Sequence, residues 1–186
     1  MSLSSIVPAK SIPDDFNVII EIPSNSSPVK YEVNKDTGLL EVDRLMTTAM
    51  YYPCNYGFVP NTLSGDGDPV DVLVVSPFAL QSGCLVRVRA LGMLAMEDEA
   101  GEDNKIIAVP IKKICRQYAA IETLQALPES LLKSLEHFFE HYKDLEEGKW
   151  VKISGWKDLN AVSKELTSSI ERYRKSCANR AVPGTV

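Results

Sequence analysis

The sequence predicts a small, mainly β barrel that is followed by two helices. Three observations indicate this fold class: a series of short β-branched segments between turn residues, helical spacing of apolar residues from position 128 onward, and a hydrophobic content of 45% over 186 residues. A chain of this length and composition buries one sizeable core, and nothing in it indicates a second domain. The number and spacing of the strands favour a barrel over a sandwich.

The first expected strands are short and rich in β-branched residues. Residues 16–23 (FNVIIEIP) and 29–34 (VKYEVN) flank the turn-rich segment SNSS, and this pattern predicts a β-hairpin. Residues 38–46 (GLLEVDRLM) are compatible with a further strand. Residues 51–62 (YYPCNYGFVPNT) contain two prolines and a glycine, which favours an ordered loop over a regular element. Three later segments complete the series of strands: 70–77, 84–96 and 105–111.

Two amphipathic helices are expected in the last third of the chain. Pro128 suits a helix start and Gly148 suits a C-cap, so the first helix is expected over residues 128–148. The second is expected from Asp158 to about Lys175. The apolar positions at helical spacing are Leu131, Leu135, Phe138, Phe139, Tyr142 and Leu145 in the first helix and Leu159, Val162, Leu166, Ile170 and Tyr173 in the second.

Charge and composition exclude several classes of protein. The formal net charge is −5 and the basic residues are scattered, which argues against a binder of nucleic acid or anionic membranes. The chain starts without a basic region followed by an apolar one, and it has no run of 18 apolar residues, so neither export nor membrane insertion is expected. The four cysteines lie far apart without a CxxC pair, which fits a reducing cytoplasm.

Three aspartates, Asp66, Asp68 and Asp71, crowd into the segment SGDGDPVDVLVV directly before an apolar run. A DGD sequence is commonly a solvated turn. Here Asp71 opens an expected strand, Gly67 permits unusual dihedrals and Pro69 restricts Asp68, so the backbone is able to bend and bring the carboxylates together. An EF-hand is excluded because the required glycine and glutamate are missing at its sixth and twelfth positions. Convergence would make an oxygen-only site for Mg²⁺ or Mn²⁺.

A second acidic cluster covers residues 97–105 (EDEAGEDNK) at the end of an expected strand. Charge runs of this kind are usually solvated hairpin tips. A functional interpretation requires Asp98 and Asp103 to face the first cluster and to add metal ligands. The spacing leaves both interpretations open.

Several cations are candidates for holding an anionic substrate. In the expected strand VKYEV, Lys30 and Glu32 share one face and Tyr31 the other. Arg44 follows Asp43 near the end of the next apolar segment, and Lys105 closes the second acidic cluster. Singly each is an ordinary surface charge, whereas together they form a set suited to phosphate groups.

The histidines offer a competing interpretation, because His137 to His141 (HFFEH) match the H-x-x-E-H pattern of a zinc peptidase helix. The i, i+4 spacing places both imidazoles on one helical face. They are the only two histidines in the chain, and apolar residues lie between them. A packed or interface pair of histidines is the simpler interpretation.

The chain closely resembles the soluble family I inorganic pyrophosphatases of bacteria. The signature is DGDPVDVLV, and family-like segments follow in family order: VIIEIP, KYEV, VDRLMTTAMYYPCNYGFVPNTL, DEAGEDNK and HFFEHYKDLEEGKWVK. The resemblance covers roughly residues 10 to 175. It implies an OB-like five-stranded closed β-barrel with two C-terminal helices packed outside, a single pyrophosphatase domain over residues 1–175, and a disordered tail over residues 176–186.

The resemblance also implies an activity and a role for each site residue. The activity is hydrolysis of inorganic diphosphate to two phosphates by a metal-activated water, with several Mg²⁺ ions or other divalent ions such as Mn²⁺. Asp68 corresponds to the general base. The implied metal ligands are Asp66, Asp71, Asp103 and Asp98; the implied phosphate-binding groups are Lys30, Arg44, Tyr56, Tyr142 and Lys143, with Lys30, Arg44 and Tyr56 also counted as catalytic; and the implied supporting residues are Glu21, Glu32, Tyr52 and Lys105.

The resemblance further implies a cytoplasmic homohexamer that binds neither nucleic acid nor membrane. His137 and His141 correspond to positions at subunit contacts, so their protonation is expected to weaken assembly at acidic pH. Two alternative functions stay open at this point: a nucleotide pyrophosphohydrolase, and a non-catalytic OB-type module that binds nucleic acid. The acidic balance of the chain disfavours the second.

Overall fold

Five strands close into a ring within residues 3–180, the part of the chain that this computed structural model describes. The β2–β7 pairing closes the ring, and every pairing in it is antiparallel except β6–β9, which is parallel. The predicted five-stranded closed barrel is therefore confirmed. In order around the ring, the strands are β2 (Asp15–Ile22), β5 (Asn55–Phe58), β6 (Asp71–Val74), β9 (Lys105–Pro110) and β7 (Leu85–Asp98).

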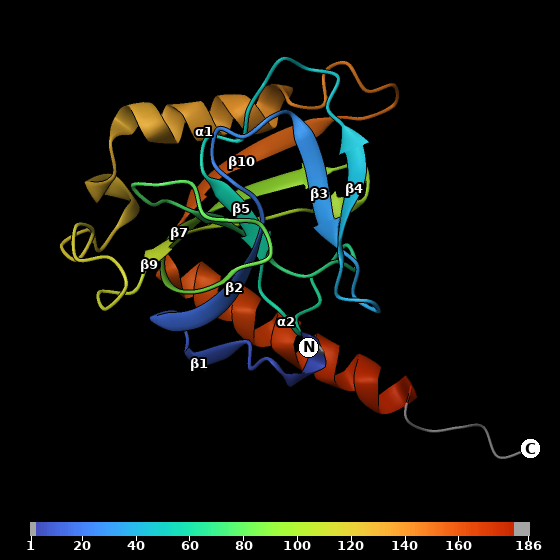
Figure 1. Ribbon diagram of the computed structural model, residues 1–186, viewed down its shortest axis with the longest axis vertical. Coiled ribbons are helices and arrows are strands. Elements are labelled where there is room, and N and C mark those ends of the chain that lie inside the picture. Colours follow the sequence, from blue (N-terminus) through green and yellow to red (C-terminus); the bar gives the residue numbers. More distant parts are fainter. Residues whose placement is uncertain (1–2, 181–186) are drawn as a thin grey trace, which may run out of the picture.

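The remaining elements decorate this barrel (Figure 1). Strands β1, β8 and β10 extend the barrel sheet, whereas β3 and β4 pair with each other in a two-stranded sheet. Helices α1 and α2 lie on opposite sides of the barrel. The bounds of these elements are η1 Leu3–Ser5, β1 Ala9–Ser11, β3 Val29–Val33, β4 Leu40–Leu45, β8 Gly101–Glu102, η2 Leu124–Ala126, α1 Glu129–His141, β10 Val151–Lys157 and α2 Leu159–Arg180.

Strand β7 is long enough to pair with four neighbours, because it runs through 14 residues and contacts β2, β9, β10 and β8 along its length. Its register against β9 shifts between Ala90 and Gly92. A bulge of this kind bends a strand and increases its twist, which a small closed barrel requires.

Alternate side chains of the ring strands face two separate cores. In β6, Leu73 belongs to a core that includes Leu135 and Phe138 of α1. The neighbouring Val72 belongs to a second core that includes Leu166 of α2. Each helix thus covers one set of alternating strand residues, and the barrel is stabilised from both sides.

Helix α1 ends at His141, seven residues before the Gly148 end expected from the sequence. The backbone N–H of Tyr142 still donates to the Phe138 carbonyl, and then single turns replace the helix. Gly148 has a φ of +75° and ends those turns instead of the helix. Leu145 is 67% exposed, so its apparent place in the apolar stripe was coincidental.

Two other expectations about the strands were wrong. Residues 16–34 do not form a hairpin: both edges of β2 are used by ring neighbours, and β3 pairs with β4 instead. The expected loop 51–62 contains ring strand β5, whose four residues are all buried. Its two prolines lie just outside the strand, which is why they do not interrupt its hydrogen bonds.

Helix α2 begins as expected and continues further than expected. The carboxylate of Asp158 accepts a hydrogen bond from the Ala161 N–H at 3.0 Å and caps the helix. The helix then runs to Arg180, so residues 176–180 of the predicted tail are helical, because no glycine or proline interrupts them. The rest of that tail lies outside the described residues. No helix within residues 3–180 is both long and apolar enough to cross a bilayer.

Replacement of Gly57 is expected to destabilise the barrel. A Cβ at this position in β5 would lie 2.0 Å from the Ile19 carbonyl oxygen of the paired strand. We expect Gly57→Ala to lower the free energy of unfolding by about 2–4 kcal/mol, because the two backbones would have to separate. Urea denaturation measures the change. The control is Gly65→Ala, whose Cβ would meet no atom within 4 Å; equal stability of the two variants would contradict the close approach.

Candidate active site

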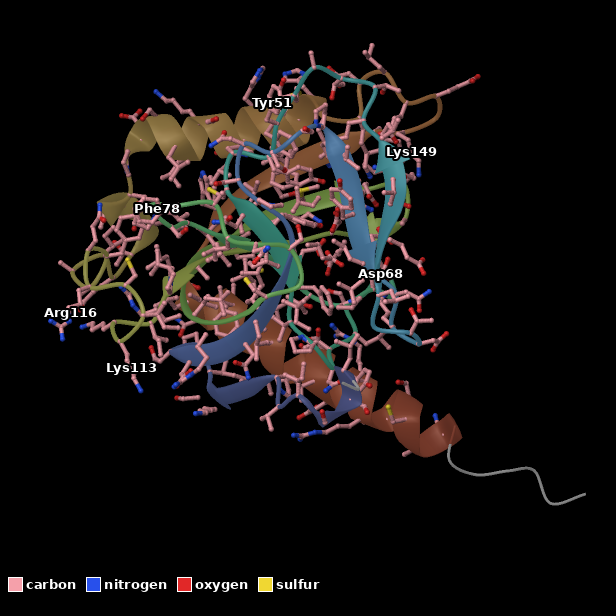
Figure 2. All side chains as sticks on the ribbon, in the orientation of Figure 1. Tyr51, Asp68, Phe78, Lys113, Arg116 and Lys149 are labelled. Atoms are coloured by element: carbon pink, nitrogen blue, oxygen red, sulfur yellow. The ribbon has the colours of Figure 1, made fainter. Side chains whose placement is uncertain are left out.

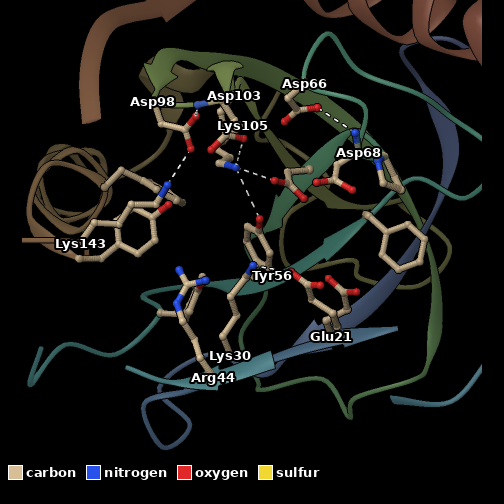
Figure 3. Close-up of a pocket in the computed structure, with 18 of the residues that line it drawn as sticks. Glu21, Lys30, Arg44, Tyr56, Asp66, Asp68, Asp98, Asp103, Lys105 and Lys143 are labelled. Atoms are coloured by element: carbon tan, nitrogen blue, oxygen red, sulfur yellow. Dashed lines mark hydrogen bonds and ion pairs between the residues drawn. The ribbon is translucent and has the colours of Figure 1, made fainter. Parts of the chain in front are cut away.

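A cavity of about 250 Å³ opens at one end of the barrel and brings together every residue that the sequence singled out for the site (Figure 3). The strands, the β3–β4 hairpin and the end of α1 each contribute a part of its wall. The predicted residues that line it are Glu21, Lys30, Glu32, Arg44, Tyr52, Tyr56, Asp66, Asp68, Asp71, Asp98, Asp103, Lys105, Tyr142 and Lys143.

The centre of the cavity is the ammonium of Lys105. Because β6 and β9 are parallel and begin together, Asp71 and Lys105 are direct neighbours in the sheet, and the Lys105 Nζ lies 2.5 Å from an Asp71 carboxylate oxygen. The ammonium also pairs with Asp103 and contacts the Tyr56 hydroxyl at 3.5 Å. Burial alone would lower the pKa of Lys105, but Asp103 and Asp71 outweigh it and raise the pKa well above its ordinary value. Lys105 is therefore a permanent cation.

The loop of the first aspartates bends as the sequence predicted. Gly67 has a φ of +94°, and the Asp68 N–H donates to the Asp66 carboxylate at 2.9 Å. This turn directs Asp66 and Asp68 into the cavity that Asp71 also lines. Burial raises the pKa of Asp66, and the negative charges of Asp103, Asp68 and Asp71 raise it further. The crowded carboxylates thus favour a cation beside Asp66.

The second acidic cluster lies beside the first and forms the same wall of the cavity. Asp98 ends β7, and its carboxylate accepts hydrogen bonds from the Ala100 N–H at 2.8 Å and from Lys143 at 2.6 Å. Burial by itself would raise the pKa of Asp98, but the hydrogen bonds from Lys143 and the Ala100 N–H, together with the positive charge of Lys143, outweigh it and lower the pKa. Asp103 lies on the same side as Asp98 in Figure 3. The structure therefore favours the functional interpretation of this cluster over a solvated hairpin tip.

Two cations of the β3–β4 hairpin form the opposite wall. Lys30 and Arg44 are directly paired across the hairpin, and a register shift next to them leaves Asp43 as an extra residue. Lys30 pairs with Glu32, and Asp43 lies 3.4 Å from Lys30 and 3.0 Å from Arg44. Figure 3 shows both side chains entering from the side opposite Asp66 and Asp103. The cavity thus has an acidic wall and a basic wall.

Aromatic rings form the floor between these walls. The ring of Tyr52 lies 5.0 Å from that of Tyr56 and 4.7 Å from that of Phe138, between centroids. Burial raises the pKa of Tyr56 well above its ordinary value, and the nearby charge of Asp71 adds to the effect. Burial likewise raises the pKa of Tyr142. Both phenols stay protonated at neutral pH and are able to donate hydrogen bonds.

Glu21 reaches the cavity because β2 is irregular at this residue. Ile20 and Ile22 pair with consecutive residues of β5, so Glu21 is the extra residue of a bulge. Its carboxylate accepts a hydrogen bond from the Val33 N–H at 2.7 Å and fixes β3 to the barrel. Burial raises the pKa of Glu21 to about 8 against that hydrogen bond, and Asp71 and Glu32 raise it further.

The cavity also has lining residues that the sequence did not single out. Charged additions are Lys35, which contacts Asp68, and the pair Glu99–Lys149 beside Lys143. Their only sequence signal was proximity to the motifs already found. The apolar additions Phe58 and Phe139 are also core residues. Phe139 was expected in the apolar stripe of the first helix, whereas Phe58 lies in the segment that was expected to be a loop.

The donor set fits divalent cations by its chemistry, since four aspartates supply only carboxylate oxygens. Among the described residues, no three acidic, histidine or cysteine side chains lie close enough together to coordinate one ion. Asp71 and Asp103 instead share the Lys105 ammonium. The raised pKa of Asp66 shows that a further positive charge would be favourable there.

The histidine pair does not line the cavity. The rings of His137 and His141 lie 4.6 Å apart at the end of α1, and the His141 Nδ1 lies 2.8 Å from an Asp144 carboxylate oxygen. This placement separates the zinc peptidase pattern from the cavity and its acidic wall.

Comparisons with known proteins agree on one family. A family model described as inorganic pyrophosphatase matches residues 18–174. The inorganic pyrophosphatase of Yersinia pestis is 55% identical over 94% of this chain and its own full length, and that of Escherichia coli K12 is 54% identical over 94% of this chain and 99% of its own. Among solved structures, an inorganic pyrophosphatase from Coxiella burnetii matches with a TM-score of 0.88 and 57% identity, over 90% of this chain and 99% of its own.

The buried Glu21 is expected to make stability fall as the pH rises. The folded chain holds this proton up to a pH of about 8, whereas the ordinary pKa is 4.5. The unfolded chain therefore binds fewer protons between these values, and the free energy of unfolding decreases across that window. Glu21→Gln removes this contribution, so the stability of the variant relative to wild type should rise by up to about 5 kcal/mol between pH 4.5 and pH 8.

Urea denaturation at a series of pH values, with chelator present, measures the Glu21 effect. Glu102→Gln is the control, because Glu102 is exposed and does not line the cavity. Parallel pH profiles of wild type and Glu21→Gln would contradict the raised pKa.

Proposed function

The chain belongs to the inorganic pyrophosphatase family, and we propose that the cavity between its acidic and basic walls hydrolyses inorganic diphosphate to two phosphates. The observation that carries the proposal is the facing arrangement of Asp66 and Asp103 against Lys30 and Arg44 across one small cavity, in which Asp71 and Asp103 share the Lys105 ammonium. A polyanion needs cations to hold it, and hydrolysis needs a group that takes a proton from water. The comparisons favour neither a nucleotide pyrophosphohydrolase nor a nucleic-acid-binding module.

The basic wall is proposed to bind the phosphate groups. Arg44 offers a planar fork of donors, and Lys30 and Lys143 offer point charges. Tyr56 and Tyr142 add neutral donors, since burial raises both pKa values. Together these groups are proposed to orient the diphosphate and to stabilise charge on the departing phosphate.

The acidic wall is proposed to hold divalent cations, of which Mg²⁺ is the expected ion and Mn²⁺ a substitute. Membership of this family implies dependence on a divalent metal ion. Asp66, Asp71, Asp98 and Asp103 would hold the ions through carboxylate oxygens. When bound, such ions offset the charge of diphosphate and make water more acidic.

Asp68 is proposed as the general base, and Lys105 as a fixed support. Asp68 is more exposed than Asp66 and Asp71, with 72% of its side chain accessible, so water reaches its carboxylate (Figure 2). The carboxylate takes a proton from the attacking water, whose oxygen then attacks a phosphorus atom in line with the leaving phosphate. Lys105 stays protonated and keeps Asp71 and Asp103 in place.

Phosphate release tests this proposal. We expect wild type to hydrolyse diphosphate with Mg²⁺, to lose activity with chelator, and to act far more slowly on ATP. Asp68→Asn should lower kcat by about 100-fold or more, because an amide cannot accept the proton. The control is Asp36→Asn, which alters an exposed aspartate outside the cavity. Metal-independent turnover, or full activity of Asp68→Asn, would overturn the mechanism.

Assembly and location extend the proposal. We infer a cytoplasmic homohexamer without nucleic-acid or membrane partners, from the family resemblance and from four cysteines that are all free thiols. His137 and His141 are available for a subunit contact, since their rings lie together outside the cavity.

Assembly is expected to depend on pH. Protonation of His137 and His141 would place positive charges on two rings whose centroids lie 4.6 Å apart, which would weaken a subunit contact made by both rings. Sedimentation velocity from pH 8 to pH 5 should show a fall in mass, and a variant with both histidines replaced by glutamine should not show it. An unchanged mass across this range would rule out the histidine contact as a pH-sensitive one.

A further inference from the structure

Lys35 is a cation at the mouth of the cavity that has no role in the reaction described above. It follows β3 in the turn to β4, lines the cavity, and its Nζ lies 2.8 Å from an Asp68 carboxylate oxygen. We propose that Lys35 is a positioning residue for diphosphate hydrolysis, because it holds the Asp68 carboxylate and its loop against the β3–β4 hairpin. This inference rests on the proposed function, in which Asp68 takes the proton from water.

The turn that carries Lys35 is well ordered. The side-chain oxygen of Asn34 accepts the backbone N–H groups of Asp36 at 3.0 Å and Thr37 at 2.9 Å. The Gly38 N–H donates to the Asn34 carbonyl at 2.8 Å, and Gly38 adopts the positive φ of +72° that this turn requires. The backbone that carries Lys35 is therefore fixed by the turn, and contact with Asp68 costs only the conformational entropy of the Lys35 side chain.

The contact joins two parts of the site that the barrel ladder does not join. The hairpin forms its own two-stranded sheet and carries Lys30 and Arg44, whereas Asp68 belongs to the loop before β6. The bond between the Val33 N–H and Glu21 anchors the hairpin to β2. Lys35 extends that anchorage across the mouth to the aspartate loop. It thereby sets where the proposed base lies relative to the phosphate-binding cations.

The exposure of the Lys35–Asp68 pair allows an effect on the reaction to be distinguished from an effect on stability. The side chains of Lys35 and Asp68 are 57% and 72% exposed. An ion pair this exposed contributes little to stability. A loss of Lys35 should consequently alter the reaction without altering the thermal midpoint, which is the reverse of what a structural lysine would do.

Lys35 would behave differently if it bound the substrate directly. If Lys35 bound the substrate directly, its removal would raise KM. That effect would persist when Asp68 is replaced, because the two residues would act independently. If Lys35 acts by positioning Asp68, its removal lowers kcat. That effect disappears once the Asp68 carboxylate has been replaced. A double-mutant cycle on the holoenzyme distinguishes the two.

The experiment measures kcat and KM for diphosphate with Mg²⁺ in wild type, Lys35→Ala, Lys35→Arg, Asp68→Asn and the double variant Lys35→Ala/Asp68→Asn. We expect Lys35→Ala to lower kcat about threefold to tenfold at unchanged thermal midpoint, and Lys35→Arg to restore most of it. In the Asp68→Asn background, loss of Lys35 should have no further effect. Amide hydrogen exchange of residues 64–70 in chelated protein should be faster in Lys35→Ala than in wild type.

The matched control is Lys133→Ala, which removes an exposed lysine paired with Glu129 at 2.7 Å outside the cavity and should change neither kcat nor exchange of that loop. Unchanged kcat in Lys35→Ala, or a further loss in the Asp68→Asn background, would overturn the inference while leaving the proposed function intact. Full activity of Asp68→Asn would instead overturn the proposed role of Asp68 as the general base, and the exchange measurement would still report whether Lys35 holds the loop.

Discussion

The buried ammonium of Lys105 is the constraint on which the site depends. Lys105 is 2% exposed, and a charge this deeply buried is tolerated only with close partners of opposite sign. The parallel pairing of β6 and β9 supplies Asp71 directly beside it, and Asp103 lies two residues earlier in the chain. If the register of β9 slipped by one residue, the Lys105 side chain would point into the hydrophobic core and the Ile106 side chain would point into the cavity. The register of β9 therefore fixes both the position of Lys105 in the cavity and the carboxylates that balance its charge.

Irregularities of the strands convert this barrel into a site. A regular β2 would alternate its side chains between the two faces of the sheet, and the bulge at Glu21 releases one side chain to the cavity and lets it anchor β3. The register shift beside Lys30 does the same for the hairpin, since it leaves Asp43 between Lys30 and Arg44 as a shared acceptor. Both irregularities lie beside charged groups, as expected of bulges that re-aim side chains.

The sequence predicted best what is local in the chain. The bend at Gly67, the shared face of Lys30 and Glu32, and the strand start at Asp71 all follow from spacing over a few residues. Spacing could not show that Asp98 meets Lys143, because 45 residues separate them; only the family resemblance joined them. The strand β5 was missed because its flanking prolines resemble loop signals, and the end of α1 was missed because Leu145 matched the apolar period by chance.

The ion pairs of the site are buried at the bottom of the cavity and become more exposed toward its mouth. Lys105 and the pair Asp98–Lys143 are nearly inaccessible, with side-chain exposures of 3%, 9% and 9%. The outer pairs Lys149–Glu99 and Lys35–Asp68 are progressively more exposed and so contribute progressively less to stability. The buried pairs hold the inner part of the cavity in a fixed geometry, because breaking a buried pair leaves an uncompensated charge. The exposed pairs at the mouth cost less to break, so a change at the mouth leaves the buried pairs in place.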